Sequence, residues 1–99
     1  KKKERCPVEE AVKILGGKWV FLILRDLSDG KQRFSDLQRS LGISPRVLSA
    51  RLDELEKAGV LSRRCFAEVP PRVEYTLTAK GRALVPVIEE MRAFGRRLM

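Results

Sequence analysis

Apolar residues recur along the chain at spacings that predict a mainly helical fold. The strongest signal lies in residues 45–58, where Leu48, Leu52 and Leu55 share one side of a helix. The other side of this segment is small, hydroxylated and basic in its N-terminal half. The leucines therefore predict a helix that buries one narrow stripe and leaves its opposite side free for another task.

Both ends of this helix are marked in the sequence. Ser44 stands at the N-cap, and Pro45 takes the first helical position, where a missing N–H costs nothing. Gly59 suits the left-handed residue that ends many helices, and Val60 would then contact Leu55, as in a Schellman ending. We therefore expect a sharply bounded helix.

A shorter helix is predicted just upstream, before Gly42. Ser35 and Gln38 have the spacing of a capping box, and two leucines four residues apart precede Gly42. Two helices joined by a short turn with a glycine match the helix-turn-helix motif, whose second helix enters the major groove of DNA. The alternative is a helical hairpin that serves packing alone.

Two further helices are expected before this motif. Pro7 begins the first, over residues 7–15, and two consecutive glycines end it. Residues 18–27 are apolar nearly all round, and their length favours a buried helix over a strand. Trp19 belongs to this apolar run, so we expect it to pack in the core.

Two short strands, residues 61–68 and 72–77, follow the motif. Val73, Tyr75 and Leu77 alternate with polar residues, and two prolines between the segments mark a turn. The pattern predicts a β-hairpin directly after a recognition helix, which is the position of a wing.

The predicted hairpin carries three arginines that bear on its role. Arg63, Arg64 and Arg72 could reach phosphates or the minor groove of DNA. In the alternative, the hairpin is a solvated sheet edge that its arginines and prolines protect from pairing with other chains.

Thr78 is expected to cap a last helix that runs to about residue 99. The apolar residues of this segment cover more of its circumference than one stripe needs. The surplus requires a partner, either the first helix of the same chain or the same helix of a second subunit. Because the segment is also basic, a helix lying on a membrane surface remains an alternative.

Length sets the number of domains, and charge narrows the choice of partner. Residues 1–99 are enough for one domain. Lys and Arg number 21 against 13 Asp and Glu, which gives a net charge of +8 at pH 7. Such a field attracts polyanions, either nucleic acid or an acidic membrane surface.

The residue types argue against an enzyme. The chain has no histidine, and it shows no Gly-rich phosphate loop and no recognisable pair of catalytic carboxylates. Cys6 and Cys65 lie too far apart in sequence for a C-x-x-C metal signature. No apolar run approaches the ~18 residues of a membrane span. We expect a reduced, cytoplasmic protein without cofactor, metal or membrane partner.

Short motifs occur in a specific order along the chain. They are C-P-V-E at residues 6–9, L-G-G-K-W at 15–19, L-I-L-R at 22–25, R-F-S-D-L at 33–37, L-D-E-L at 52–55, V-P-P-R-V-E-Y at 69–75 and L-T at 77–78. In this order and spacing, from residue 6 to about residue 88, the chain resembles the HxlR family of winged helix-turn-helix regulators, relatives of the MarR-type proteins.

The resemblance implies a prokaryotic, homodimeric transcription regulator, with repression as the expected effect, on a palindromic operator in double-stranded DNA. It places the DNA-binding core with its wing at residues 34–77 and the dimerisation helices at residues 6–15 and 78–99. The residues expected nearest DNA are Ser35, Ser44, Arg46, Val47, Ser49, Ala50, Arg51, Arg63, Arg64 and Arg72. The residues expected in the dimer interface are Val8, Val12, Leu84, Val87, Ile88, Met91 and Phe94. A small-molecule effector is compatible with this picture, but the sequence identifies none.

Cys6 is a candidate regulatory residue. Some HxlR-type proteins sense electrophiles or oxidants through a cysteine near the N-terminus, and Cys6 is the matching residue here. A thiol beside Arg5 at the start of a helix lies in a positive potential that stabilises the thiolate, although Glu9 and Glu10 oppose it. A packing role for Cys6 stays open, and Cys65 is expected to be structural.

A second class of function also stays open. Winged helices also serve as protein-docking or dimerisation modules, in which case the positive charge would serve solubility. A steep fall of DNA affinity with salt would count against that role, since each neutralised phosphate adds about 0.9 to the log–log slope.

Overall fold

The computed structural model describes residues 6–99 of the chain, and the basic residues 1–5 lie outside the described part. The elements, in chain order, are α1 (Pro7–Leu15), α2 (Lys18–Ser28), β1 (Gln32–Arg33), α3 (Phe34–Leu41), α4 (Pro45–Lys57), β2 (Leu61–Phe66), β3 (Arg72–Leu77), α5 (Ala79–Arg82) and α6 (Val85–Leu98). The predicted class is confirmed: the fold is a winged helix-turn-helix, mainly helical with a small antiparallel sheet.

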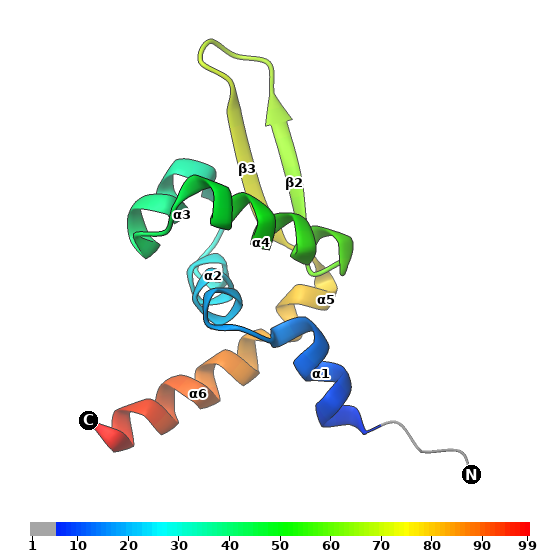
Figure 1. Cartoon of the computed structure of the whole chain (residues 1–99), viewed down its shortest axis with the longest axis vertical. Helices are drawn as coiled ribbons and strands as arrows, with labels where there is room; N and C mark the ends of the chain where they lie inside the picture. Colours follow the sequence, from blue (N-terminus) through cyan, green and yellow to red (C-terminus); the bar gives the residue numbers. More distant parts are fainter. Residues whose placement is uncertain (1–5) are drawn as a thin grey trace.

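The elements are spread along one direction. The β2–β3 hairpin projects from the helical body at one end, and α1 and α6 diverge from it at the other (Figure 1). The helix α2 lies between these extremes, and its side chains Ile23, Leu24 and Leu27 are buried. The core thus connects the hairpin end to the end that carries α1 and α6.

The predicted limits of the long helix are confirmed at α4. The Ser44 hydroxyl accepts a hydrogen bond from the Val47 N–H at 3.3 Å. Gly59 has φ +79°, and the Val60 N–H donates to the Leu55 carbonyl at 3.0 Å, as a Schellman ending requires. The leucine stripe of α4 is fully buried, so its other side faces outward.

The helix α3 begins two residues earlier than the capping-box spacing indicates. Phe34 is its first residue, so Ser35 lies inside the first turn and caps nothing. The Arg33 N–H instead donates to the Asp36 carboxylate at 3.2 Å. The predicted capping box was therefore wrong, because Asp36 supplies a charged acceptor at the place where the sequence offered Gln38.

The predicted continuous last helix was also wrong, because the chain forms two helices there. Thr78 caps the short α5 by accepting from the Gly81 N–H at 3.1 Å, and α6 begins only at Val85. Pro86 explains the break: it lacks the N–H of a helical bond, and its ring would clash with the carbonyl four residues earlier.

The sheet contains one strand that the sequence did not reveal. The two residues of β1 pair with β3, so the sheet order is β1-β3-β2 and β3 is central. Tyr75 and Leu77 are buried, as the alternation predicted. Glu74, predicted on the polar face, is 8% exposed, because a central strand has neighbours on both sides.

Two further expectations concern the core and the membrane. Trp19 is only partly buried against the core, and the Lys18 ammonium lies 4.7 Å from the centre of its ring. Within residues 6–99, no helix has the length and apolar character needed to cross a bilayer.

Candidate nucleic-acid interface

The outward side of α4 is open. Ser44, Arg46, Val47, Ser49 and Ala50 are all exposed. None of the ion pairs in the described part of the chain involves the Arg46 guanidinium, so it is free to meet a ligand.

Arg51 differs from Arg46, although both lie on α4. It is half-buried, and its Nη2 lies 3.1 Å from the Glu54 carboxylate. Its Nε is buried and has no hydrogen-bond partner among the described residues. Arg51 must therefore leave Glu54 before it can make a bidentate contact with a base or phosphate.

The hairpin register separates the three wing arginines. Arg63 pairs with Tyr75 across the sheet, whereas Arg64 pairs with Glu74. Successive side chains of a strand point to opposite faces, so Arg63 lies on the face toward α4, and Arg64 and Arg72 lie on the other. We call these the inner and outer faces of the hairpin.

On the inner face, Arg63 contributes to a groove beside α4 that also contains Ser49 and Tyr75. The pKa of Arg63 is raised, first by the neighbouring Cys65 and then by Tyr75, which also hydrogen-bonds to it. Burial raises the pKa of Tyr75, and the positive charge of Arg63 only partly opposes this. At neutral pH this face therefore presents a cation and a neutral phenol.

On the outer face, two arginines stack on one aromatic ring. The Arg72 guanidinium lies 4.0 Å from the centre of the Phe66 ring, and that of Arg64 lies 5.1 Å from it. Arg72 also pairs with the Glu68 carboxylate at 3.0 Å and with Glu74 at 3.4 Å. Arg64 has no carboxylate partner within residues 6–99, so the two arginines differ in their freedom.

A second groove lies where α3, the start of α4 and the hairpin turn meet. It has a volume of about 550 Å³, and its lining includes Arg33, Ser35, Gln38, Pro45 and Arg72. Ser35 was among the residues predicted to lie near DNA, whereas Arg33 and Gln38, which line the same groove, were not. Arg33 could have been found from the sequence, because it is a basic residue directly before the first helix of the motif.

Comparison with known proteins bears on this geometry. The model of the HxlR-like helix-turn-helix family matches residues 14–99. The chain belongs to that family. The resemblance seen in the sequence motifs is thereby confirmed.

Relatives and solved structures of this family cover nearly the whole chain. An uncharacterised HTH-type transcriptional regulator of Bacillus subtilis, YvaP, is 50% identical over 90 residues, which is 89% of this chain and 83% of the relative. A structure from Porphyromonas gingivalis ascribed to the MarR family of transcriptional regulators has a TM-score of 0.92 at 36% identity, covering 99% of this chain and 97% of that one.

A redox regulator is also among the similar structures. The redox regulator HypR in its reduced form has a TM-score of 0.87 and 39% identity, with 93% of this chain and 92% of that chain covered. The same regulator is known in its oxidised form, at a TM-score of 0.86.

The two cysteines of this HxlR-like chain lie in different surroundings. Cys6 occupies the N-cap position of α1, directly before Pro7, and is half-buried. Cys65 is exposed on the inner face of the hairpin, opposite Val73. The expectation that Cys65 packs as a structural residue is wrong, because the hairpin extends beyond the helices that would cover it.

The terminal helices of the HxlR-like fold expose apolar side chains. Val8 and Val12 on α1, and Val87, Met91 and Phe94 on α6, are all at least 40% exposed. Leu84 is half-buried. Ile88 departs from the predicted interface set: it is 5% exposed in the single chain and belongs to the core.

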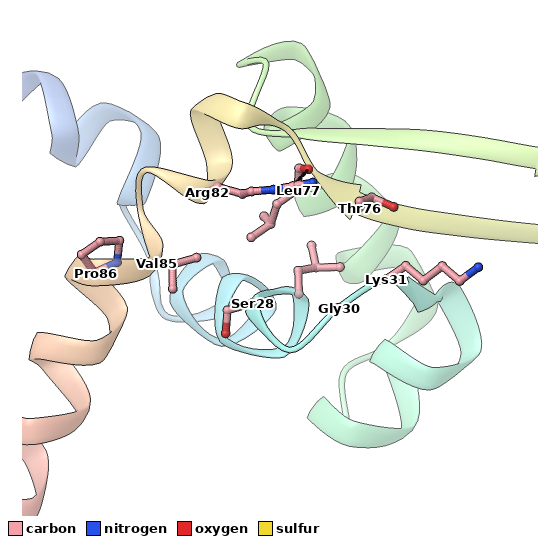
Figure 2. Close-up of a pocket in the computed structure, with 9 residues that line it drawn as sticks. Ser28, Gly30, Lys31, Thr76, Leu77, Arg82, Val85 and Pro86 are labelled. Atoms are coloured by element: carbon pink, nitrogen blue, oxygen red, sulfur yellow. Dashed lines mark hydrogen bonds between the residues drawn. The ribbon is translucent and has the colours of Figure 1, made fainter.

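One hollow lies apart from the recognition helix. It has a volume of about 470 Å³ and lies between the end of α2, strand β3 and the α5–α6 junction (Figure 2). Leu77 and Val85 form part of its apolar lining, and Lys31 and Arg82 belong to its edge. The hollow thus lies where α6 joins the rest of the fold.

Proposed function

We propose that this HxlR-family chain is a sequence-specific DNA-binding repressor that acts as a homodimer on a palindromic operator. The observation that carries the proposal is the open side of α4 beside the hairpin, where Arg46 is exposed and unpaired. In this proposal α4 enters the major groove, and Arg46 contacts a guanine edge or a phosphate. The hairpin reaches the adjacent minor groove.

The proposed path of the DNA backbone follows the groove between α3 and the hairpin turn. Arg33 and Ser35 lie on one side of this groove, and the prolines of the turn lie on the other. A phosphate there would meet a cation, a hydroxyl and the positive end of α3. Arg33 therefore joins the predicted contact residues in this proposal.

The shape of the single chain supports the proposed dimer. Its radius of gyration is 14.9 Å, whereas a compact domain of about 100 residues has about 13 Å. The excess reflects the projecting hairpin and the diverging α1 and α6, whose exposed apolar residues need a cover. A two-fold dimer through α1 and α6 would place two α4 helices about 34 Å apart, one turn of DNA.

Redox control through Cys6 is a further part of the proposal. The similarity to HypR, a redox regulator solved in reduced and oxidised forms, supports it. Cys6 precedes α1, so a covalent change at this thiol would act on a helix of the proposed dimer interface. Such a change would alter the spacing of the two recognition helices.

Selection of preferred duplexes from a random DNA pool tests this function, with reduced protein, diamide-treated protein and the Cys6→Ser variant. We expect an enriched palindrome, bound about 10- to 100-fold more weakly by Arg46→Ala. Lys57→Ala, at the far end of α4 and paired with Asp53, serves as the control and should bind almost normally.

Each result has a defined meaning for the proposal. If diamide weakens binding by the native chain and not by Cys6→Ser, the redox part holds. A palindrome indifferent to diamide would keep the regulator and remove the sensor. The absence of any enriched sequence would favour a protein-docking module instead.

A further inference from the structure

Glu74 is an unexpected residue in a surface that is meant to bind a polyanion. Among residues 6–99 it is the only charged residue that is buried, at 8% exposed. It lies in the middle of β3, the central strand, within the DNA-binding half of the molecule. A carboxylate there repels phosphates and is costly to bury, so its presence calls for a specific role.

The surroundings of Glu74 are strongly cationic. Its carboxylate lies 3.6 Å from the Lys31 ammonium and 3.4 Å from Arg72 Nε. In the sheet register it pairs with Arg33 on one side and with Arg64 on the other, at a spacing where side chains interact. One carboxylate thus has two cations within 4 Å and two further arginines as cross-strand neighbours.

Two of these cations are engaged by Glu74 in the free chain. Within residues 6–99, Lys31 pairs with Glu74 alone, whereas Arg72 pairs with Glu74 and, at 3.0 Å, with the more exposed Glu68. Arg33 and Arg64 form no ion pair in the described part of the chain. A DNA phosphate must compete with Glu74 for the engaged cations. A buried carboxylate with fixed geometry is a strong competitor, because little entropy remains to be lost in the pair.

We propose that Glu74 determines specificity by withholding Lys31 and Arg72 from DNA. The proposal rests on the DNA-binding function above and deepens it. Sequence-independent affinity grows with the number of phosphates that are neutralised. With two cations held by an internal anion, less of the binding free energy comes from charge alone, and more depends on the contacts of α4 with base edges.

The central test uses Glu74→Gln, which keeps the shape of the side chain and removes its charge. Binding is measured on a random-sequence duplex and on the selected operator over a series of salt concentrations. For the random duplex we expect the log–log salt slope to steepen by about one to two, and affinity to rise on the order of ten-fold at low salt. Operator affinity should change less, because base contacts fix the register there, so the specificity ratio falls.

Glu89→Gln is the matched control. It makes the same change of charge at an exposed residue of α6 that pairs with Arg92. If net charge alone mattered, both variants would change the slope equally. We expect Glu89→Gln to leave it nearly unchanged.

A second substitution tests the mechanism directly. In the native chain, Arg72→Gln should leave the salt slope on random DNA unchanged, since Arg72 is already neutralised. In the Glu74→Gln background, the same substitution should reverse part of the steepening. If Glu74→Gln does not fold, as judged by circular dichroism, a slope that falls in Arg72→Gln alone would still overturn the proposal.

The results separate this inference from the proposed function. A native chain that binds no DNA would overturn the function itself. Normal operator binding with an unchanged slope in folded Glu74→Gln would overturn only the role of Glu74. A slope that falls by about one in Arg72→Gln would likewise overturn it, because Arg72 would then contact DNA in the native chain.

Discussion

The arginines of α4 and the hairpin differ in whether they are ion-paired, because their immediate neighbours differ. Arg46 on α4 is exposed and unpaired within the described chain, whereas Glu54 holds Arg51 on the same helix. Arg72 is held by two carboxylates and lies over an aromatic ring. At the residue scale, the availability of a cation therefore depends on the carboxylates around it more than on its own exposure.

Ser44 allows a simple test of helix capping. Its hydroxyl accepts the Val47 N–H at the start of α4. Ser44→Ala should lower the free energy of unfolding by about 1 kcal/mol, because one donor of the first turn loses its partner. Urea unfolding followed by circular dichroism measures this. Ser62→Ala, at an exposed residue of β2, is the control, and an equal loss in both variants would contradict the capping role.

We expect Tyr75 to make the stability of the fold depend on pH in the alkaline range. Burial raises its pKa, so the folded chain keeps the phenolic proton at a pH where the unfolded chain, with a pKa of about 10, loses it. The protonated phenol of Tyr75 therefore contributes fully to the free energy of unfolding below about pH 10, and this contribution is lost as pH rises through the raised pKa. Melting temperatures between about pH 8 and 11 should fall more steeply for the native chain than for Tyr75→Phe. Parallel curves would contradict this prediction.

At the element scale, the end of the recognition helix is held by the segment that follows the hairpin. The Thr78 hydroxyl donates to the carbonyls of Gly59 at 2.6 Å and Val60 at 3.0 Å. The Lys80 ammonium donates to the Ala58 carbonyl at 2.8 Å. The short helix α5 and Thr78 thus fix the C-terminal end of α4, and in the proposed function this would set the angle at which α4 meets DNA.

Gly81 makes this contact between elements possible. A β-carbon at Gly81 would overlap the Val60 carbonyl oxygen, so Gly81→Ala must move α5 away from the end of α4. We expect the free energy of unfolding to fall by about 1–3 kcal/mol, the usual cost of overpacking a core, as measured by thermal unfolding. Gly95→Ala in α6 meets no atom within 4 Å and should instead be neutral or stabilise by about 0.5–1 kcal/mol. A neutral Gly81→Ala would contradict the close approach.

At the scale of the whole molecule, the single chain leaves large apolar side chains exposed. Its extents are 55 × 39 × 24 Å, and the exposed apolar side chains gather on α1 and α6, at the end away from the hairpin. A monomer rarely leaves such an apolar surface uncovered. The proposed function accordingly assigns the hairpin end to DNA and the end with α1 and α6 to a second copy of the chain.

A matched pair of substitutions tests whether α1 and α6 form a dimer interface. Val12, 57% exposed on α1, and Val69, 101% exposed in the hairpin turn, can each be changed to Glu. Val12→Glu should shift the chain from dimer to monomer in analytical ultracentrifugation, because a charge would be buried in the interface. Val69→Glu should leave the mass unchanged. Dimers of equal strength in both variants would place the interface elsewhere.

The sequence by itself determined the elements whose signals are local. Ser44, the leucine stripe of α4 and Gly59 fixed that helix, since caps and apolar periodicity act within a few residues. The alternation in β3 fixed the hairpin in the same way. Together with the ordered motifs, these signals sufficed for the fold class and the family.

Only the tertiary structure decided which basic side chains are paired with carboxylates and which are not. β1 is two residues long and carries no local signal, yet it makes β3 central and so buries Glu74. The sheet register then places Arg63 and Arg64 on opposite faces and brings Lys31 to Glu74 across a distance in sequence that no periodicity encodes. Ion pairs between separate elements depend on how those elements pack. The sequence therefore identified the basic residues, and the packing of the elements determined which of them are paired with carboxylates.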